Sequence, residues 1–406
     1  MKPVVVTGIG ALASNGMSTE TYWSATVDGT AGIGPISRFE PETYPIALAG
    51  EMASFDPKEH VPSRLLVETS MMSHLAIAAA DAALADAKLV TSALPEYEMA
   101  VITANATGGV EVGQRELQKL WSEGPEHVSA YMSIAWFYAA TTGQLSIRHK
   151  MRGHCGVVVS EQAGGLDAIG HARRLLNQGH RMALAGGTES TMAPAGLVAQ
   201  IPTGHLSPRK DPARAYLPFD VDAVGYLPGE GGAILVLEEA GSAQARGVTQ
   251  PYGEIVGYAA TFDPRPGRGR PPTLWRAAEQ AVADAGLTPA DIDVVFADAY
   301  GIPSLDRVEA DAIAAVFGPR GVPVTAPKTM TGRLYGGGGA LDVATALLSI
   351  RDGVIPPTVN VTSVDPEYQI DLVLGESRPA PLRHALVLGR GYGGFNAAIV
   401  VKGNDN

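Results

Sequence analysis

The chain has 406 residues, of which 18% are charged, and its formal net charge is −12. Such an acidic protein is a poor partner for nucleic acid or for an anionic membrane surface. The sequence holds no uncharged apolar run of the roughly 18 residues that a membrane span requires, and no signal-peptide segment at its start. We therefore expect no membrane segment, no secretion and, by default, a cytoplasmic location.

The chain has a single cysteine, Cys155, which excludes an internal disulfide framework and a multi-cysteine metal site. It follows His154, and adjacent residues of an extended segment point to opposite faces, so the two do not form a catalytic pair. We expect a buried structural thiol at this position and no metal site in the protein.

The first predicted element is a buried strand over residues 4–10. Its end resembles a dinucleotide-binding turn, because Gly8, Gly10 and Ala13 match the pattern G-x-G-x-x-A. That turn requires a helix to start at once, whereas Ser-Asn-Gly at residues 14–16 breaks the chain. We interpret the glycines as a strand end and not as a nucleotide site.

Two segments about 200 residues apart repeat the same order of elements. Residues 70–89 show a helical pattern rich in alanine, and residues 100–104 form an apolar strand. Residues 274–287 and 294–298 repeat this helix and strand, which indicates an internal duplication. Alternating strands and helices predict mainly parallel sheets covered by helices. We expect an N-terminal half at 1–245 and a C-terminal half at 246–406, joined as one structural unit.

The residues around position 160 predict a strand, a sharp turn and a buried helix. Residues 156–159 are mostly apolar, small residues follow, and Leu166, Ile169 and Leu175 recur at helical spacing. Such an elbow presents one side chain at a helix N-terminus, where free backbone N–H groups stabilise a thiolate or an oxyanion. Here the presented residue is Gln162, which cannot attack a thioester.

The segment Glu-Gln-Ala-Gly-Gly-Leu-Asp-Ala at 161–168 resembles the nucleophile turn of the β-ketoacyl synthases of the thiolase superfamily. Gln162 stands in the place of the usual Cys. A Gln at this place is typical of the chain-length factor, the ketosynthase β subunit of type II (aromatic) polyketide synthases. The resemblance extends from Val4 to Val401. It implies a duplicated thiolase-like α/β fold of five layers, α-β-α-β-α, with two mainly parallel or mixed sheets.

The resemblance also assigns the places of the family's two catalytic histidines. Tyr300 occupies the place of the first and Arg333 the place of the second. By contrast, Lys328 and Glu309, which support the hydrogen-bond network of the family's site, are retained. The frame is kept while all three chemical groups, including Gln162, are exchanged, so we expect no catalytic residue in this chain.

The function implied by the resemblance is that of a subunit silent by itself, within an acyltransferase complex of antibiotic biosynthesis. It pairs with a catalytic ketosynthase α subunit as a heterodimer and needs no cofactor of its own, because the phosphopantetheine of an acyl carrier protein reaches the partner subunit. An interface cavity encloses the polyketide intermediate and sets its length. Residues expected in the cavity wall or interface are Thr107, Gly109, Val110, Val112, Gly113, Met132, Ile134, Phe137, Ala195 and Leu197, and Tyr392 takes the place of a gate.

Two other functions stay open at this point. A Gln-type malonyl decarboxylase would use the carboxamide of Gln162 to bind the malonyl thioester and so prime the synthase. Members of that class keep both histidines, which are exchanged here. A purely architectural partner would affect product yield and never product size.

Overall fold

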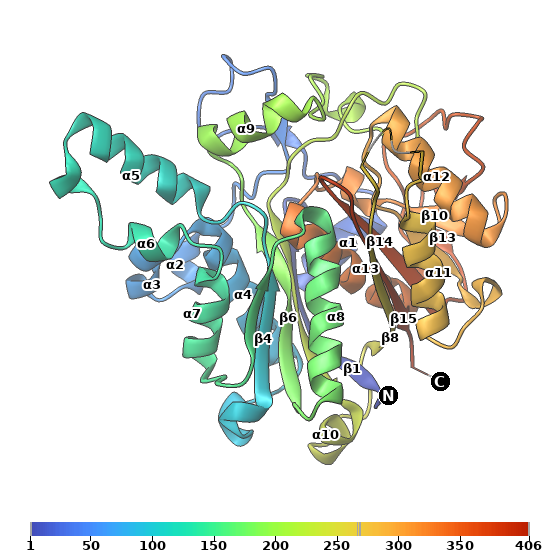
Figure 1. Ribbon diagram of the computed structural model, residues 1–406, viewed down its shortest axis with the longest axis horizontal. Helices are drawn as coiled ribbons and strands as arrows, with labels where there is room; N and C mark the ends of the chain where they lie inside the picture. Colours follow the sequence, from blue (N-terminus) through green and yellow to red (C-terminus); the bar gives the residue numbers. More distant parts are fainter. Residues whose placement is uncertain (1, 266, 268, 405–406) are drawn as a thin grey trace.

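The computed structural model describes residues 2–265, 267 and 269–404. Helices and strands alternate in layers, with α8 and α13 enclosed between two groups of strands (Figure 1). Helix α4 covers the outer face of one group through β1 and β7, and α11 covers the outer face of the other through β8 and β15. The predicted five-layer α/β fold is confirmed.

The described residues form one large mixed sheet and two two-stranded sheets. The pairs are β2 (Gly34–Pro35) with β3 (Leu48–Ala49) and β11 (Val354–Ile355) with β13 (Arg378–Pro379). In spatial order the large sheet contains β12 (Asp371–Leu372), β10 (Pro323–Thr325), β9 (Val294–Phe296), β14 (His384–Gly391), β15 (Phe395–Lys402), β8 (Gly253–Phe262), β1 (Val4–Ala13), β7 (Gly231–Glu239), β6 (Met182–Glu189), β4 (Met99–Ala104) and β5 (Cys155–Val158).

The internal duplication predicted from the sequence is visible in the order of the strands. The N-terminal group β5-β4-β6-β7-β1 and the C-terminal group β10-β9-β14-β15-β8 have the same order and the same pattern of parallel and antiparallel neighbours. The two groups are joined through β1 and β8 at the pairs Val5–Glu254 and Val6–Gly253. The two predicted sheets are therefore halves of one continuous sheet. The boundary predicted at 245–246 follows the end of α10, and the division into two domains stays a prediction.

The helices agree with the expected periodic segments: α4 and α11 begin within a residue of the predicted starts. The two central helices approach closely, because a Cβ at Gly165 would lie 2.5 Å from the backbone nitrogen of Ala340. The helices are α1 (Thr19–Val27), α2 (Pro57–His60), α3 (Ser63–Glu68), α4 (Met71–Asp86), α5 (Val110–Ser122), α6 (Met132–Ala135), α7 (Ala140–His149), α8 (Gly164–Asn177), α9 (Pro194–Gln200), α10 (Ala240–Ala245), α11 (Leu274–Asp284), α12 (Pro303–Phe317) and α13 (Gly338–Asp352). None of these helices has the length and apolar character needed to cross a bilayer.

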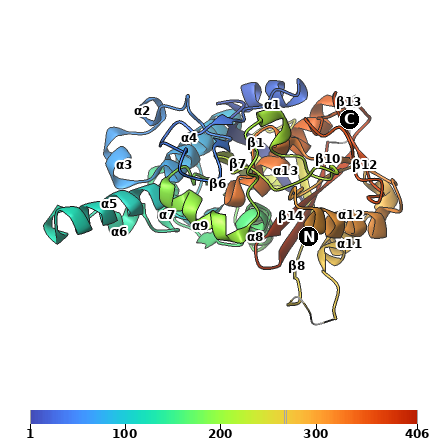
Figure 2. The ribbon, with the colours of Figure 1, turned by 90° about the horizontal axis from the view of Figure 1, so that it is seen from above.

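One end of the molecule carries a projecting arm and an open sheet edge. Helices α5 and α6 extend away from the layered body in both views (Figures 1 and 2). Strand β5 pairs with β4 alone and forms the edge of the large sheet on this side. Cys155 lies on β5 and is exposed. The expectation of a buried thiol was wrong, because an apolar strand at a sheet edge has the same sequence pattern as a covered one.

Candidate functional site

Gln162 lies in a short 3-10 turn, Glu161–Ala163, between β5 and α8. The turn is sharp, since Glu161 has a left-handed φ of 52°. Gln162 is buried, and a Cβ at Gly338 would lie 2.1 Å from its Nε2 atom, so the glycine makes room for the long side chain. Neither Oε1 nor Nε2 has a hydrogen-bond partner among the described residues. A carboxamide therefore occupies the end of the elbow, where no thiol or hydroxyl stands.

Arg333 fills the centre of this site with a fully buried cation. Its Nη1 atom lies 2.9 Å from Oδ2 of Asp298, and its Nε atom donates to Oε1 of Glu161 at 3.4 Å. Its Nη2 atom donates to the carbonyl of Arg390 at 2.5 Å. The guanidinium carbon lies 3.8 Å from the ring centre of Tyr300. The structure thus brings together Arg333 and Tyr300, which the sequence analysis assigned to one site.

Asp298, like Glu161, is a residue of this site to which the sequence analysis gave no role. It is fully buried just after β9, and its Oδ1 atom accepts the backbone N–H of Arg390 at 2.9 Å. A signal was present, because Asp298 is the one charged residue in the otherwise apolar stretch 294–300. A buried acid requires a cationic or hydrogen-bonding partner. That partner is Arg333, 35 residues further along the chain.

The electrostatics of the site keep Arg333 charged and Tyr300 neutral near neutral pH. Burial lowers the pKa of Arg333, but the charges of Asp298 and Glu161 outweigh it and hold the pKa well above the usual value. Burial and the charge of Glu161 raise the pKa of Tyr300 well above its usual range. Arg333 stays a cation and Tyr300 a neutral phenol, so neither can act as an imidazole does.

The retained residues hold the walls of the site in place. Nζ of Lys328 lies 2.8 Å from Oδ2 of Asp342 and also donates to the carbonyl of Ala297. The carboxylate of Glu309 accepts the backbone N–H groups of Asp298 and Ala299 at 2.7 and 2.8 Å. These bonds fix the chain at the end of β9 and the turn before Arg333. Both residues therefore support the backbone frame rather than chemistry.

We call the buried group of Gln162, Tyr300, Arg333 and Asp298 the filled site. A cavity of about 390 Å³ lies beside it and is lined in part by Tyr300. Tyr300 forms part of its floor, and Tyr392, which is 59% exposed, stands at its side. The backbone N–H of Tyr392 donates to Oε2 of Glu161 at 2.9 Å, so the predicted gate is tied to the elbow. The described residues that line this cavity include no cysteine, serine or threonine.

Residues 1–243 match the family model of the β-ketoacyl synthase N-terminal domain, and residues 252–362 match that of the C-terminal domain. This chain belongs to the β-ketoacyl synthase family.

Curated relatives of this β-ketoacyl synthase family member align over almost its whole length. It is 58% identical to the tetracenomycin polyketide synthase ketoacyl synthase beta subunit of Streptomyces glaucescens, over 98% of both chains. It is 56% identical to the actinorhodin polyketide putative beta-ketoacyl synthase 2 of Streptomyces coelicolor, again over 98% of both chains. Among solved structures, the ishigamide ketosynthase/chain length factor superimposes with a TM-score of 0.91 at 28% identity, over 100% of both chains.

The residues expected to wall a cavity meet where α5 contacts α9 and α6. The backbone N–H of Ala195 donates to Oε1 of Gln114 at 2.8 Å, and a Cβ at Gly196 would lie 3.3 Å from Val110. A Cβ at Gly113 would lie 2.6 Å from the Trp136 ring, so Gly113 faces the segment that follows α6. The predicted residues at or beside these contacts are Thr107, Gly109, Val110, Gly113, Met132, Ala195 and Leu197.

Val112 differs from the other predicted wall residues of α5. It is buried on another face of the helix and lines a separate cavity of about 410 Å³, which His74 and Glu111 also line. The sequence placed Val112 beside Val110, but residues two apart on a helix do not share a face. Its place in the polyketide wall stays a prediction.

The arm of this family member exposes an apolar surface beside the free edge of β5. Ile134 is 44% and Phe137 is 53% exposed, and Tyr131, Trp136 and Tyr138 are also exposed. We call these five side chains the arm patch. Exposed apolar groups gathered in this way mark an interaction surface.

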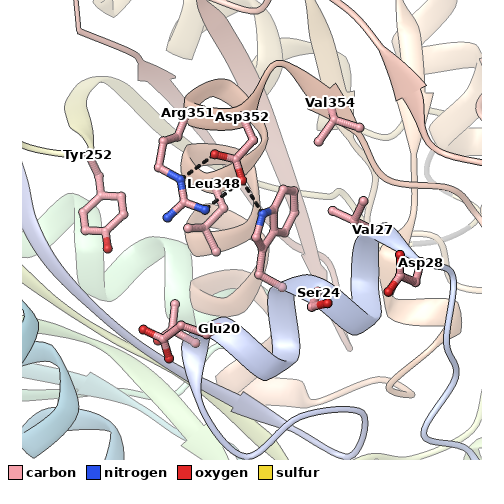
Figure 3. A pocket seen from close by; sticks show the side chains of 11 residues that line it. Glu20, Ser24, Val27, Asp28, Tyr252, Leu348, Arg351, Asp352 and Val354 are labelled. Carbon is pink, nitrogen blue, oxygen red and sulfur yellow. Dashed lines mark hydrogen bonds and ion pairs between the residues drawn. The ribbon is translucent and has the colours of Figure 1, made fainter.

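A further cavity of about 450 Å³ lies between α1 and the end of α13 (Figure 3). Three of its polar groups are paired with one another: Nε1 of Trp23 donates to Asp352 at 2.6 Å, and Arg351 bonds the same carboxylate. Glu20 and Asp28 also line it. The described residues also contain no group of three or more His, Cys, Asp or Glu side chains placed to hold a metal ion.

Proposed function

We propose that this chain is the non-catalytic chain-length factor of a type II polyketide synthase, paired with a catalytic ketosynthase α subunit. The observation that carries the proposal is the buried Gln162 at the elbow, backed by the cation of Arg333 where the family has a histidine. Without a nucleophile the chain cannot hold an acyl group. The beta subunit and chain length factor among its relatives support this function.

The arm patch and β5 provide the surface for the α subunit. An unpaired edge strand offers a row of backbone donors and acceptors, and the arm patch adds exposed aromatic rings. Obligate interfaces of this kind bury on the order of 2,000 Å² or more. The complex is cytoplasmic, and the phosphopantetheine of the acyl carrier protein enters the partner subunit. The chain uses no cofactor of its own.

The polyketide intermediate lies in a cavity between the arm of this chain and the α subunit. A reactive poly-β-keto chain must be enclosed, and the contact of α5 with α9 supplies a rigid wall against which elongation stops. Small side chains at Val110 and Ala195 leave room for a long product. Overfilling a packed cavity costs about 1–3 kcal/mol, which is enough to halt addition of another unit.

The proposal is tested by reconstituting the two subunits with acyl carrier protein and malonyl units. Mass spectrometry should find the acyl adduct on the α subunit and none on this chain. Ala195→Trp should shorten the product while the complex stays intact. An acyl adduct on Cys155 or on any residue of 160–168 would contradict the proposal.

One observation favours a second candidate, a Gln-type malonyl decarboxylase that primes the synthase. Both amide atoms of Gln162 lack a hydrogen-bond partner among the described residues, so they could bind a malonyl thioester that reached them. Gln162→Ala separates the two functions. Loss of acetyl priming with normal elongation would favour the decarboxylase, whereas unchanged priming leaves the chain-length factor.

A further inference from the structure

Glu189 is a fully buried carboxylate at the end of β6, close to the start of α5. Its Oε2 atom accepts the backbone N–H of Ala106 at 2.5 Å, and its Oε1 atom accepts the hydroxyl of Thr107 at 2.7 Å. Backbone N–H groups of Ser190 and Gly336 also bond this carboxylate. One side chain therefore joins β6, the loop before α5, and a turn of the C-terminal half.

We infer that Glu189 is a positioning residue that fixes the start of α5 and thereby determines the length of the polyketide. The inference rests on the proposed function, because it assigns Glu189 a role in the cavity wall described there. Glu189 itself does not touch the intermediate. It acts through Ala106 and Thr107, which lead directly into Gly109 and α5.

The start of α5 is held by this contact and by Glu111 in its first turn, whose Oε1 atom accepts the backbone N–H of Met71 at 2.7 Å. The N-cap residue is Gly109, which has no side chain to bond the free N–H groups of the helix. The backbone N–H of Gly109 donates to the carbonyl of Trp136 at 3.2 Å, on the side of the exposed arm patch. Glu189 supplies the connection to the rigid sheet. A shift of the loop by one ångström would move Val110 and Gly113 by a similar distance.

The turn bonded by Glu189 also links the cavity wall to the filled site. Gly336 lies in the 3-10 turn Tyr335–Gly337, three residues after Arg333, and its Cα faces Asn105, because a Cβ there would lie 2.4 Å from the Cα of Asn105. The four donors to Glu189 are all uncharged. Burial raises the pKa of Glu189 to about 7, and these donors only partly offset that effect. Glu189 thus accepts hydrogen bonds from the loop before α5 and forms no ion pair with the groups that bond it.

The test uses the reconstituted complex with the α subunit and carrier protein and measures the distribution of product lengths by mass spectrometry. For Glu189→Gln and Thr107→Val, we expect the ratio of full-length to other products to fall about tenfold, as for loss of one hydrogen bond to a buried carboxylate. Thr107→Ser keeps the hydroxyl and should keep the wild-type distribution. Glu238→Gln is the matched control, since Glu238 is equally buried but bonds Thr7 and Arg246 at the opposite end of these strands.

Malonyl consumption and complex formation are measured in parallel, because a merely structural role would lower these and leave product length unchanged. An unchanged distribution for Glu189→Gln and Thr107→Val in an intact, active complex would overturn the inference. If Glu189→Gln fails to assemble, the Thr107→Val and Thr107→Ser pair decides. Ala195→Trp is included as a variant of the cavity wall. If Ala195→Trp shortens the product and Glu189→Gln does not, the inference is wrong and the proposed function stands. No effect of Ala195→Trp would overturn the proposed function and the inference with it.

Discussion

Arg333 shows how a single side chain can stabilise a site that has lost its chemistry. The buried carboxylate of Asp298 and the partly buried carboxylate of Glu161 face its guanidinium, and Tyr300 covers one side. Removing one partner of a buried ion pair leaves an uncompensated charge. Arg333→Ala should therefore lower the free energy of unfolding by about 3–5 kcal/mol, measured by urea denaturation of the complex.

Arg351→Ala provides the matched control, because its pair with Asp352 is partly exposed and should contribute at most about 1 kcal/mol. A loss of stability no larger for Arg333→Ala than for Arg351→Ala would contradict the role of Arg333 as the charge that fills the site.

Glu189 gives a prediction for the pH dependence of stability. Its pKa rises from 4.5 in the unfolded chain to about 7 in the folded protein. Stability from this group is therefore present below pH 4.5 and is lost as the pH rises through about 7. Glu189→Gln removes this titration. The stability difference between wild type and variant should shift by about 3 kcal/mol in favour of the variant from pH 4.5 to 8, as measured by urea unfolding. A difference independent of pH would contradict the assignment.

The residues of the filled site were only partly predictable from the sequence. Gln162, Arg333, Lys328 and Glu309 stand in motifs whose spacing survives. Asp298 was missed because its importance depends on a partner far along the chain, and local spacing does not show that contact. The place of Val112 on α5 likewise depends on which way the helix faces, and residues outside the helix decide this.

Among the elements, the edge strand β5 and the arm patch carry the prediction about assembly. Phe137→Glu should weaken binding of the α subunit at least about thirtyfold, as expected for an aromatic anchor of an interface. The free chain should keep its stability, because Phe137 is half exposed and supports little of the core. Titration calorimetry checks the affinity, with the exposed Val90→Glu as control. Equal affinities for both variants would remove the arm patch from the interface.

The reactivity of Cys155 gives a second test of the role of β5. This cysteine is exposed on β5 in the free chain, so a thiol reagent should label it readily. Binding of the α subunit along β5 should slow this labelling at least about tenfold, because strand pairing covers the edge. Labelling rates followed by mass spectrometry, with and without the partner, give the result. An unchanged rate would mean that the α subunit binds elsewhere.

The periodic elements were the most predictable part of the fold. The helices α4 and α11 and the strands β4 and β9 follow from spacing within single segments. The join between the two halves did not follow from any pattern, because it depends on two residue pairs between β1 and β8. The exposure of β5 was missed for the same reason. The position of a strand at the edge of a sheet depends on the topology of the whole fold. The sequence of the strand itself does not determine it.

For the whole molecule, the duplicated halves differ at their outer edges. In the C-terminal half β12 covers β10, whereas the equivalent strand β5 of the N-terminal half has no further neighbour. Strand β12 contributes two residue pairs, too few to template the pairing of another chain. The two halves therefore differ at their outer strands. Among the described strands, only the β5 edge is open to pairing with a strand of another chain.

This asymmetry limits the number of subunits. A chain with two open edges could add partners at both ends and form a fibre, but a chain with one open edge can be extended once. Association through β5 covers this open edge with one partner. Extension of the sheet thus stops after one partner, because only one edge of the described sheet is open. Elongation of the polyketide stops in the same way, because the cavity is closed at one end.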